Sequence, residues 1–331
     1  MSNKTKVKFL LVKPILTKEE IKEKEGDYFD EHHYTKHNKV ITTDTDVYGL
    51  EENGTKKLLL KFRKNVIPQS VCSDAYTALE KHARHKNSNR GAAAGKLSLS
   101  KLPNHVGEII KQDKYRVFYK TKNGTVSRDN VSNIAQSNIA GYYDRPDRNN
   151  YNKINEQNKT QKKEIPMCRT TQFTKKNVEK WKKSIPLIEY ADILFKKLIP
   201  DRHKIQLERA TKTPEFQINN TAYSTITINY NWRTAAHCDS GDLDEGFGNL
   251  IILEKAKSGF TGKDGFKDGI KDGFKGGYLG FPRWGVCVDC RQGDFLAMDV
   301  HEYHSNTPIE GDGRLSVVCY LRKKMINCMK K

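Results

Sequence analysis

Long apolar runs are missing from this chain of 331 residues. No stretch approaches the roughly 18 consecutive apolar residues that a membrane-spanning helix needs. The first residues also lack the apolar segment and the small-residue cleavage site of a signal peptide. Cysteine is sparse and odd in number, with 7 in the chain, which does not indicate a disulfide framework. We therefore expect no membrane partner and a reducing, intracellular compartment, with nucleus and cytoplasm not distinguished.

Acidic residues are in the minority. The chain has 40 Asp and Glu against 59 Lys and Arg, a formal net charge of +19. This excess is larger than solubility requires, and it favours a polyanionic partner such as nucleic acid. Apolar residues make up 36% of the chain and charged residues 30%, so much of the sequence must form polar surface or loops. The length fits one large domain or two ordinary ones.

Residues 1–165 contain no recognisable catalytic motif, and we expect them to form an N-terminal α/β region packed on the remainder. The apolar spacing of residues 68–86 predicts a helix. Residues 115–119 and 125–127 read as strands joined by a hairpin turn at Asn-Gly.

Two features of this first half have two readings each. The small residues of 87–95 indicate either a loop that contacts substrate or phosphate through Arg90, or a tight turn. Three histidines, His32, His33 and His37, could suggest a metal site, but a solvated loop is favoured because no cysteine or carboxylate lies at ligand spacing.

A strongly polar segment over residues 145–164 predicts a loop or linker. After it, residues 174–200 show helical periodicity with one apolar face. Pro186 predicts a kink or two helices, with Ser184 as a possible cap. The opposite face is rich in lysine and forms either an ordinary solvated surface or a surface that faces nucleic acid; its lysines are Lys175, Lys176, Lys180, Lys182 and Lys183.

From residue 205 onward, short strand patterns with glycine turns dominate, which predicts a sandwich or barrel. The predicted strands are 221–230, 249–254, 285–289, 294–299 and 315–321. Residues 263–278 repeat the unit Lys-Asp-Gly every four residues and read as an expanded surface loop. Calcium binding by Asp264, Asp268 and Asp272 is disfavoured because the EF-hand spacing is absent.

The residues with the clearest chemistry are His237 and Asp239. They are two positions apart, so an extended backbone places both side chains on one face, where they can hold one metal ion. A second histidine from 301–304 would complete the two-histidine, one-carboxylate triad of non-haem Fe(II) oxygenases. His301 and His304 both qualify, and His304 directly precedes a turn.

Ten residues after His304, Arg314 begins a predicted strand. An arginine deep in a barrel can hold a carboxylate through a two-pronged hydrogen bond. Ser316 lies two residues on, on the same strand face, and can add a hydroxyl donor.

Together these residues resemble the double-stranded β-helix of 2-oxoglutarate/Fe(II)-dependent dioxygenases, and more narrowly the TET/JBP group. The resemblance covers roughly residues 168–322. Its flanking segments are Ala-His-Cys-Asp-Ser-Gly-Asp-Leu at 236–243, Gly-Tyr-Leu-Gly-Phe-Pro-Arg-Trp-Gly at 277–285 and Asp-Val-His-Glu-Tyr-His-Ser-Asn-Thr-Pro at 299–308. It implies an α+β fold with a jelly-roll or cupin-like core flanked by N-terminal helices, and a dioxygenase domain over 166–331.

The resemblance also implies cofactors and roles. Fe(II) is expected on His237, Asp239 and His304, with 2-oxoglutarate as cosubstrate, O2 as oxidant and ascorbate as a possible stimulant. Arg314 and Ser316 would bind the distal carboxylate of 2-oxoglutarate. Asn229 and Arg233, on the strand that enters the triad, could face its other carboxylate.

Several nearby residues have weaker readings. Asp242 could support His237 from behind. Tyr230 and Trp232 could stack on a flipped base, although core packing is favoured. Residues 287–290 read Cys-Val-Asp-Cys, which could suggest zinc or redox chemistry, but residues three apart on a strand face opposite sides, so buried structural thiols are favoured. Cys238 should point away from the metal.

The expected function is hydroxylation of the methyl group of a nucleic-acid base, 5-methylcytosine or thymine, with DNA the expected partner and a monomer the expected state. One alternative is a prolyl or lysyl hydroxylase of the same superfamily, which would have a neutral or acidic groove. The other is a catalytically dead oxygenase fold that binds nucleic acid.

Overall fold

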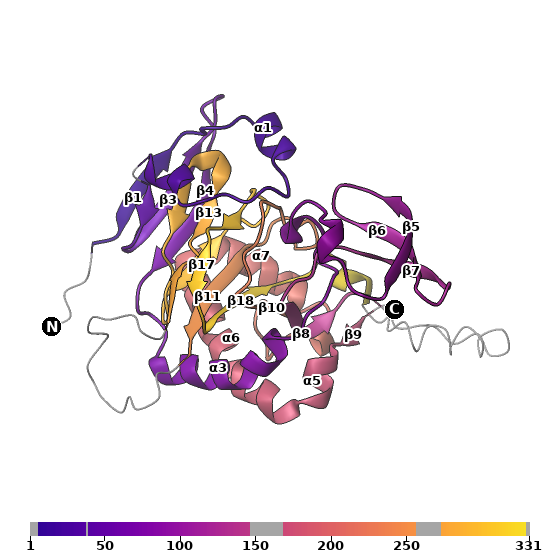
Figure 1. The fold of residues 1–331 in the computed structure, drawn as a ribbon. Coiled ribbons are helices and arrows are strands. Elements are labelled where there is room, and N and C mark those ends of the chain that lie inside the picture. The colour runs from indigo at the N-terminus through magenta and orange to yellow at the C-terminus, as the bar shows by residue number, and fades with distance from the viewer. Residues whose placement is uncertain (1–5, 38, 146–167, 256–272, 329–331) are drawn as a thin grey trace.

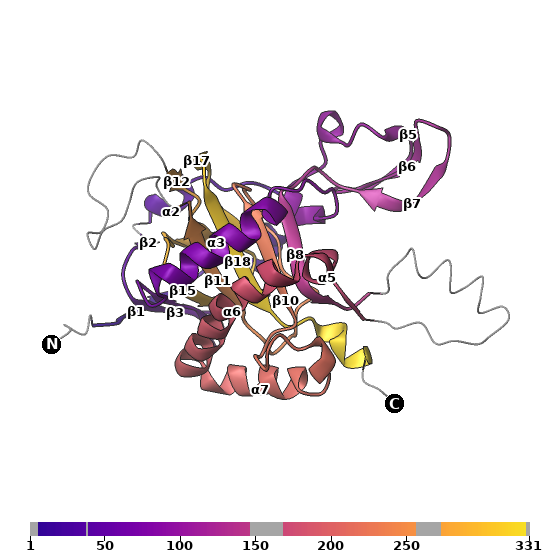
Figure 2. The same cartoon turned by 90° about the horizontal axis from the view of Figure 1, so that it is seen from below.

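A computed structural model describes residues 6–37, 39–145, 168–255 and 273–328. Its largest element is a nine-stranded sheet, here called the main sheet, with helices on one face (Figures 1 and 2). The mixed α and β content predicted from the sequence is confirmed. In spatial order the strands of the main sheet are β1 (Lys8–Val12), β3 (Thr45–Leu50), β4 (Lys56–Arg63), β15 (Phe295–Met298), β11 (Gly248–Glu254), β18 (Arg314–Tyr320), β10 (Thr225–Tyr230), β8 (Ser137–Tyr143) and β9 (Arg169–Thr170).

An interior strand of the main sheet, β18, pairs antiparallel with β11 on one side and with β10 on the other. β-Branched residues fill these strands and fit a pleated, buried surface. Leu315, Val317 and Cys319 point to the same face and are fully buried in the core beneath the helices. The alternation leaves Arg314, Ser316 and Val318 on the other face, where the pocket described below lies.

Residues from the first half of the chain extend the main sheet at both ends. At one end, β4 pairs antiparallel with β15, so that Phe295 lies opposite Arg63. At the other end, β8 pairs antiparallel with β10, so that Thr225 lies opposite Gly141. β1 pairs parallel with β3 and forms the outer edge. The polar segment predicted at 145–164 lies, after residue 145, outside the described residues.

Helices cover one face of the main sheet (Figure 2). The predicted helix over 68–86 is confirmed as α3 (Gln69–Ala83), which packs on α6 (Val178–Leu198). Of the two alternatives at Pro186, a division into two helices there was wrong, because α6 continues through this residue, and a kink stays a prediction. The break falls instead at Asn177, which separates α6 from α5 (Gln172–Lys176).

Ser184 is therefore not a cap. Its hydroxyl lies inside α6 and donates to the carbonyl oxygen of Trp181 at 2.7 Å. One further helix, α7 (Pro200–Ala210), follows α6 directly and begins with proline, which tolerates the first position of a helix.

A second, smaller sheet lies on the face of the main sheet that the helices do not cover. This minor sheet has the order β16 (Ser305–Asn306), β13 (Leu279–Phe281), β14 (Val286–Val288) and β2 (Val40–Ile41). Between the two sheets lies a core that includes the fully buried Trp284 and Phe281. Trp284 packs so closely on β3 that a Cβ added at Gly49 would lie 2.6 Å from its ring. β12 (Phe274–Gly276) and β17 (Ile309–Gly311) pair as a separate antiparallel ribbon. In the sequence, β12 directly precedes β13 and β17 directly follows β16.

A third unit projects from the body (Figure 1). This small sheet has the order β5 (Val106–Gln112), β6 (Val117–Thr121) and β7 (Val126–Val131), and it has its own apolar cluster. The hairpin turn predicted at Asn123-Gly124 is confirmed between β6 and β7, where Gly124 has a φ of +79°. The remaining short elements are α1 (Lys18–Glu23), α2 (His32–Thr35) and the 3-10 turns η1 (Gly91–Ala94), η2 (Leu99–Lys101), η3 (Pro214–Phe216), η4 (Pro282–Trp284) and η5 (Lys323–Cys328).

One disulfide joins Cys168, just before β9, to Cys328 at the end of η5, with the two Cα atoms 5.8 Å apart. The sequence did not predict this bond. The other five cysteines are free, and four of them are buried. Among the described helices, none has both the length and the apolarity that a membrane crossing requires.

Candidate metal centre and pocket

The structure brings His237, Asp239 and His304 together, and we call these three residues the triad. Their ligating atoms all lie within 4.8 Å of one another. The two Nε2 atoms, of His237 and His304, are each 3.7 Å from a different oxygen of the Asp239 carboxylate. Such an arrangement of two imidazoles and one carboxylate on one side of a common centre leaves other coordination positions open.

Each histidine of the triad is oriented by a backbone carbonyl. The Nδ1 of His237 lies 2.8 Å from the carbonyl oxygen of Ala235, and the Nδ1 of His304 lies 2.9 Å from that of Glu302. A hydrogen on each Nδ1 leaves Nε2 free as a metal ligand. Burial and the nearby His304 lower the pKa of His237 well below its ordinary value. The imidazole is therefore neutral, as a metal ligand must be.

His301 does not join the triad. Its Nδ1 lies 3.3 Å from the Asp299 carboxylate, and this hydrogen bond raises the pKa of His301. The choice of His304 over His301 thus agrees with the geometry, and the turn after His304 was the useful signal.

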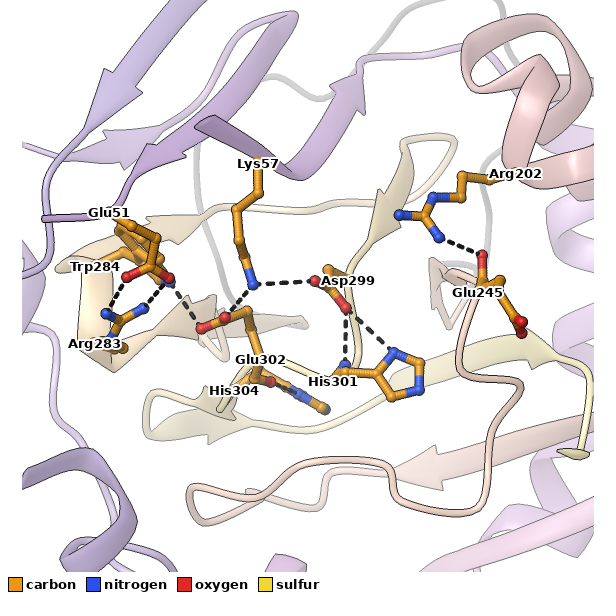
Figure 3. Close-up of polar contacts among 10 residues, drawn as sticks. All are labelled: Glu51, Lys57, Arg202, Glu245, Arg283, Trp284, Asp299, His301, Glu302 and His304. Carbon is orange, nitrogen blue, oxygen red and sulfur yellow. Dashed lines mark hydrogen bonds and ion pairs between the residues drawn. The ribbon is translucent and has the colours of Figure 1, made fainter. Parts of the chain in front are cut away.

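Behind His304 lies a cluster of charged side chains (Figure 3). The Glu302 carboxylate accepts a hydrogen bond from Trp284 Nε1 at 2.9 Å and contacts the ammonium of Lys57, which comes from β4. The same ammonium lies 3.4 Å from Asp299. The side chains of Glu302 and Asp299 are only 12% and 18% exposed. Lys57 therefore ties the first half of the chain to the loop that carries His304.

Arg314 lies fully buried beside the triad, at the start of β18. Its Nη2 donates to the carbonyl oxygen of Gly277 at 3.0 Å. Its Nε and Nη1 are buried and have no hydrogen-bond partner among the residues that the structure describes. Burial lowers the pKa of Arg314 to about 10, so the guanidinium stays charged at neutral pH. A buried cation with two free donors fits an anionic ligand such as a carboxylate.

Asn229 and Ser316 lie on paired strands beside this arginine. The Asn229 Nδ2 donates to the Ser316 hydroxyl at 3.1 Å, while the Asn229 Oδ1 is buried without a partner. Both residues line the same pocket as Arg314 and the triad.

That pocket has a volume of about 420 Å³ and opens to solvent. Arg90 lines it, and its Nε and Nη2 donate to the carbonyl oxygen of Ser137 at 3.0 and 2.7 Å. Of the two readings of residues 87–95, the geometry supports a loop that faces the site. Arg233 is not among the lining residues. Its guanidinium binds the Asp30 carboxylate at 2.7 Å and the carbonyl oxygen of Phe29.

The mouth of the pocket is basic and aromatic. Residues that the sequence patterns did not single out also line it, namely Tyr115, Arg116, Tyr143, Arg145, Tyr320 and Arg322. Arg322 donates to the Asp144 carboxylate at 2.6 Å. They come from three separate segments, so no local pattern in the sequence could have grouped them.

Of the nearby residues with less specific predictions, some line the pocket and others lie in the core. Trp232, Asp242 and Cys238 line the pocket. Asp242 does not support the imidazole of His237, because the carbonyl of Ala235 takes that position. Burial raises the pKa of the Cys238 thiol to about 12, and its expected direction away from the metal stays a prediction.

Tyr230 packs in the core beneath the helices, and its hydroxyl donates to Asp312 at 2.8 Å. Cys287 and Cys290 are buried in different apolar clusters, as the strand spacing predicted. His33 binds the carbonyl oxygen of Pro282 at 2.8 Å, and within the described residues the triad is the single group with metal-ligand spacing. The calcium alternative at 264–272 lies outside the described residues.

Helix α6 lies on the helical side of the main sheet (Figure 2), and none of the five lysines is among the residues that line the pocket. Two of its lysines form ion pairs with acidic neighbours, Lys182 with Glu179 at 3.0 Å and Lys183 with Asp74 at 3.1 Å. This placement favours the reading as an ordinary solvated face.

Comparison with known proteins agrees with this geometry. The chain is 33% identical over 161 residues to thymine dioxygenase JBP1 of Trypanosoma brucei brucei, which is 47% of this chain and 17% of that protein. It is 26% identical over 291 residues to the bifunctional helicase and thymine dioxygenase JBP2 of Leishmania infantum, covering 87% of this chain and 20% of that protein. The alignments thus span a fifth or less of these curated relatives.

A solved structure described as NgTET1 in complex with 5mC DNA is also similar, with a TM-score of 0.47, 11% identity and coverage of 93% of this chain and 92% of that chain. The family model that matches describes the oxygenase domain of the 2OGFeDO superfamily, and it covers residues 154–323, slightly more than half of the chain and all of the triad. Since that match includes the triad and Arg314, the chain belongs to the Tet_JBP family.

Proposed function

We propose that this protein is a 2-oxoglutarate- and Fe(II)-dependent dioxygenase that hydroxylates the methyl group of a nucleic-acid base. The observation that carries the proposal is the position of the triad beside Arg314, whose buried Nε and Nη1 have no partner, in one open pocket. A buried, unpaired cation is costly without an anion. The site therefore fits a metal and a carboxylate ligand at the same time.

His237, Asp239 and His304 would hold Fe(II), and Arg314 would hold the distal carboxylate of 2-oxoglutarate with help from Ser316. The iron and 2-oxoglutarate supply the oxygen activation and the oxidising power. This chain orients both, and its buried walls limit access of water. Arg90, rather than Arg233, would add positive charge beside the cosubstrate, because Arg90 lines the pocket and Arg233 binds Asp30. The two facing sheets around the pocket would then form the double-stranded β-helix core.

The proposed substrate is a base in DNA, with thymine the first candidate because the relatives JBP1 and JBP2 are thymine dioxygenases. An enzyme that modifies a base must take it out of the stack. The pocket mouth offers positive charge for the phosphates and aromatic side chains for the base, including Arg116, Arg322 and Trp232. This basic lining counts against a prolyl or lysyl hydroxylase, which would favour a neutral or acidic groove.

The test measures succinate from purified protein with Fe(II), ascorbate and 2-oxoglutarate. Duplex DNA rich in A·T pairs, 5-methylcytosine duplex, RNA and no nucleic acid are compared, and nucleosides are then identified by mass spectrometry. His237→Ala serves as the inactive control. We expect succinate formation that rises with DNA and yields a hydroxymethyl base.

Succinate that is independent of nucleic acid would retain the dioxygenase and reject the proposed substrate. Absence of succinate from iron-loaded protein with every substrate would reject the enzyme and favour a binding protein with an inactive oxygenase fold.

A further inference from the structure

One face of the small sheet does not contribute to its apolar cluster. Val117 and Tyr119 of β6 and Val131 of β7 are buried together in its apolar cluster. Side chains alternate along a strand, so Phe118 points to the opposite face. Lys111 of β5 and Asn130 of β7 pair with Phe118 on either side and share that face. Phe118 is 37% exposed there.

The small sheet and its flanking turns have the composition of a unit that binds nucleic acid, because residues 96–131 contain eight Lys and Arg against three Asp and Glu. Phe118 lies between a basic and an amide side chain. Lys120, two residues further along β6, pairs with Glu108 at 2.7 Å, which leaves Lys111 as the cation next to Phe118. Phosphates pair with lysine, and an exposed aromatic ring can stack on a base.

The face is continuous with the mouth of the pocket. Arg116, two residues before Phe118, lines the pocket together with Tyr115. The turn that carries both is held firmly, because the Asp113 carboxylate accepts hydrogen bonds from the backbone nitrogens of Tyr115 and Arg116, each at 2.8 Å. The Tyr115 hydroxyl then donates to the carbonyl oxygen of Glu25 at 3.1 Å.

The small sheet is also docked on the body. The backbone nitrogen of Leu97 donates to the carbonyl oxygen of Lys114 at 2.8 Å. The buried Asn133 side chain donates to the carbonyl oxygens of Ala94 and Lys96, each at 2.9 Å. Since residues 91–94 form the η1 turn beside the pocket, these bonds keep the sheet in a set position relative to the triad.

We infer that the Lys111–Phe118–Asn130 face of the small sheet binds the DNA strand next to the base that enters the pocket. This inference rests on the proposed function and adds the surface that holds the substrate. Lys111 contacts a phosphate, and Phe118 stacks on a neighbouring base. The lysine-rich face of α6 takes no part, because it lies on the other side of the main sheet.

The test compares Lys111→Ala and Phe118→Ala with the unchanged full chain, using fluorescence anisotropy on a labelled A·T-rich duplex across a series of salt concentrations. We expect Lys111→Ala to reduce the slope of log K against log salt by about 1. We expect Phe118→Ala to weaken binding by about 5- to 150-fold. Matched controls are Lys180→Ala on α6 and Phe9→Ala, an exposed aromatic on β1, which should bind as the unchanged protein does.

Circular dichroism and the absorbance of the Fe(II)–2-oxoglutarate complex verify that each variant is folded and loads its cofactors. If the unchanged protein oxidises DNA while both variants retain its affinity and salt slope, the surface is rejected and the proposed function stands. If the unchanged protein neither binds nor oxidises nucleic acid, both are rejected together.

Discussion

His237 and His304 are paired through their backbones as well as through their side chains. The amide nitrogen of each donates to the carbonyl oxygen of the other, at 3.1 and 3.0 Å, as in one rung of an antiparallel ladder. The two residues are 67 positions apart in the sequence. Their imidazoles therefore meet because an isolated bridge joins the two backbone segments, and Asp239 is fixed to the same loop through a 3.0 Å bond from its nitrogen to the carbonyl oxygen of Val300.

Replacement of a triad histidine should abolish metal-dependent turnover. His304→Ala removes one of three protein ligands, so we expect weak Fe(II) binding and succinate at the level of metal-free protein. His301→Ala, three residues away, is the matched control and should retain Fe(II) binding. Titration of Fe(II) under anaerobic conditions measures both. Equal losses in the two variants would show that the distal ligand has been assigned incorrectly.

Arg314 should control the affinity for 2-oxoglutarate rather than for iron. Arg314→Lys keeps the charge but loses the planar fork, and hydrogen bonds to charged groups contribute about 1.5 to 3 kcal/mol, so KM should rise roughly 10- to 150-fold. Steady-state succinate formation at saturating Fe(II) gives this value. Arg291→Lys, an arginine that binds Asp289 outside the pocket lining, provides the control. An unchanged KM would rule out Arg314 as the carboxylate anchor.

Lys57 should act as a positioning residue for His304. Lys57→Met leaves Glu302 buried without its cation, so the loop that carries His304 should lose its set position (Figure 3). Loss of such an outer partner typically costs 10- to 100-fold in metal affinity. Lys61→Met on the same strand, which breaks an ion pair with Asp46 instead, is the matched control. Fe(II) affinity and thermal unfolding are measured together for both variants. A general loss of stability would lower the Fe(II) affinity of Lys57→Met and of Lys61→Met alike, whereas a positioning role predicts a loss in Lys57→Met alone.

The Asp299–His301 pair should make stability depend on pH. The hydrogen bond that His301 donates to the Asp299 carboxylate raises the pKa of His301 above 6.5. The protonated imidazole therefore stabilises the fold fully below pH 6.5, and this contribution is lost as the pH rises through the raised pKa. Burial alone would raise the pKa of Asp299, but hydrogen bonds from His301 and the positive charge of Lys57 hold this pKa below 3.8. The contribution of the Asp299 carboxylate to the stability of the fold is therefore lost only as the pH falls through this lowered pKa.

We thus expect His301→Gln to lower the free energy of unfolding more at mildly acidic pH than at alkaline pH. Urea denaturation of the whole chain at a series of pH values measures the difference. His85→Gln, at an exposed position after α3, is the control. If His301→Gln lowers the free energy of unfolding by the same amount at every pH, the Asp299–His301 pair does not make stability depend on pH.

Local patterns in the sequence predicted the strands of the second half, helix α3 and the hairpin turn at Gly124, because apolar spacing and turn residues act over short distances. His237, Asp239 and His304 could be proposed because two of them are neighbours and the third precedes a recognisable turn. The strand alternation also correctly separated Cys287 from Cys290.

Features that depend on long-range packing were not predictable. The lining of the pocket by Arg322 and Arg116, and the engagement of Arg233 by Asp30, follow from loops that meet only in three dimensions. The continuity of α6 through Pro186 depends on the burial of Leu187 and Ile188 against the main sheet, which outweighs the local cost of proline. The pairing of Cys168 with Cys328 spans 160 residues and leaves no local signature.

The order of strands also has a consequence for synthesis. β18, the strand that joins β11 to β10 in the main sheet, comes last among its nine strands in the chain, and β4 finds its partner β15 more than 200 residues later. A ribosome therefore releases the other eight strands before the one that connects the two halves of the sheet exists. The core cannot close before β18 has emerged, and unpaired edges of β10 and β11 stay available to chaperones or to neighbouring nascent chains until then.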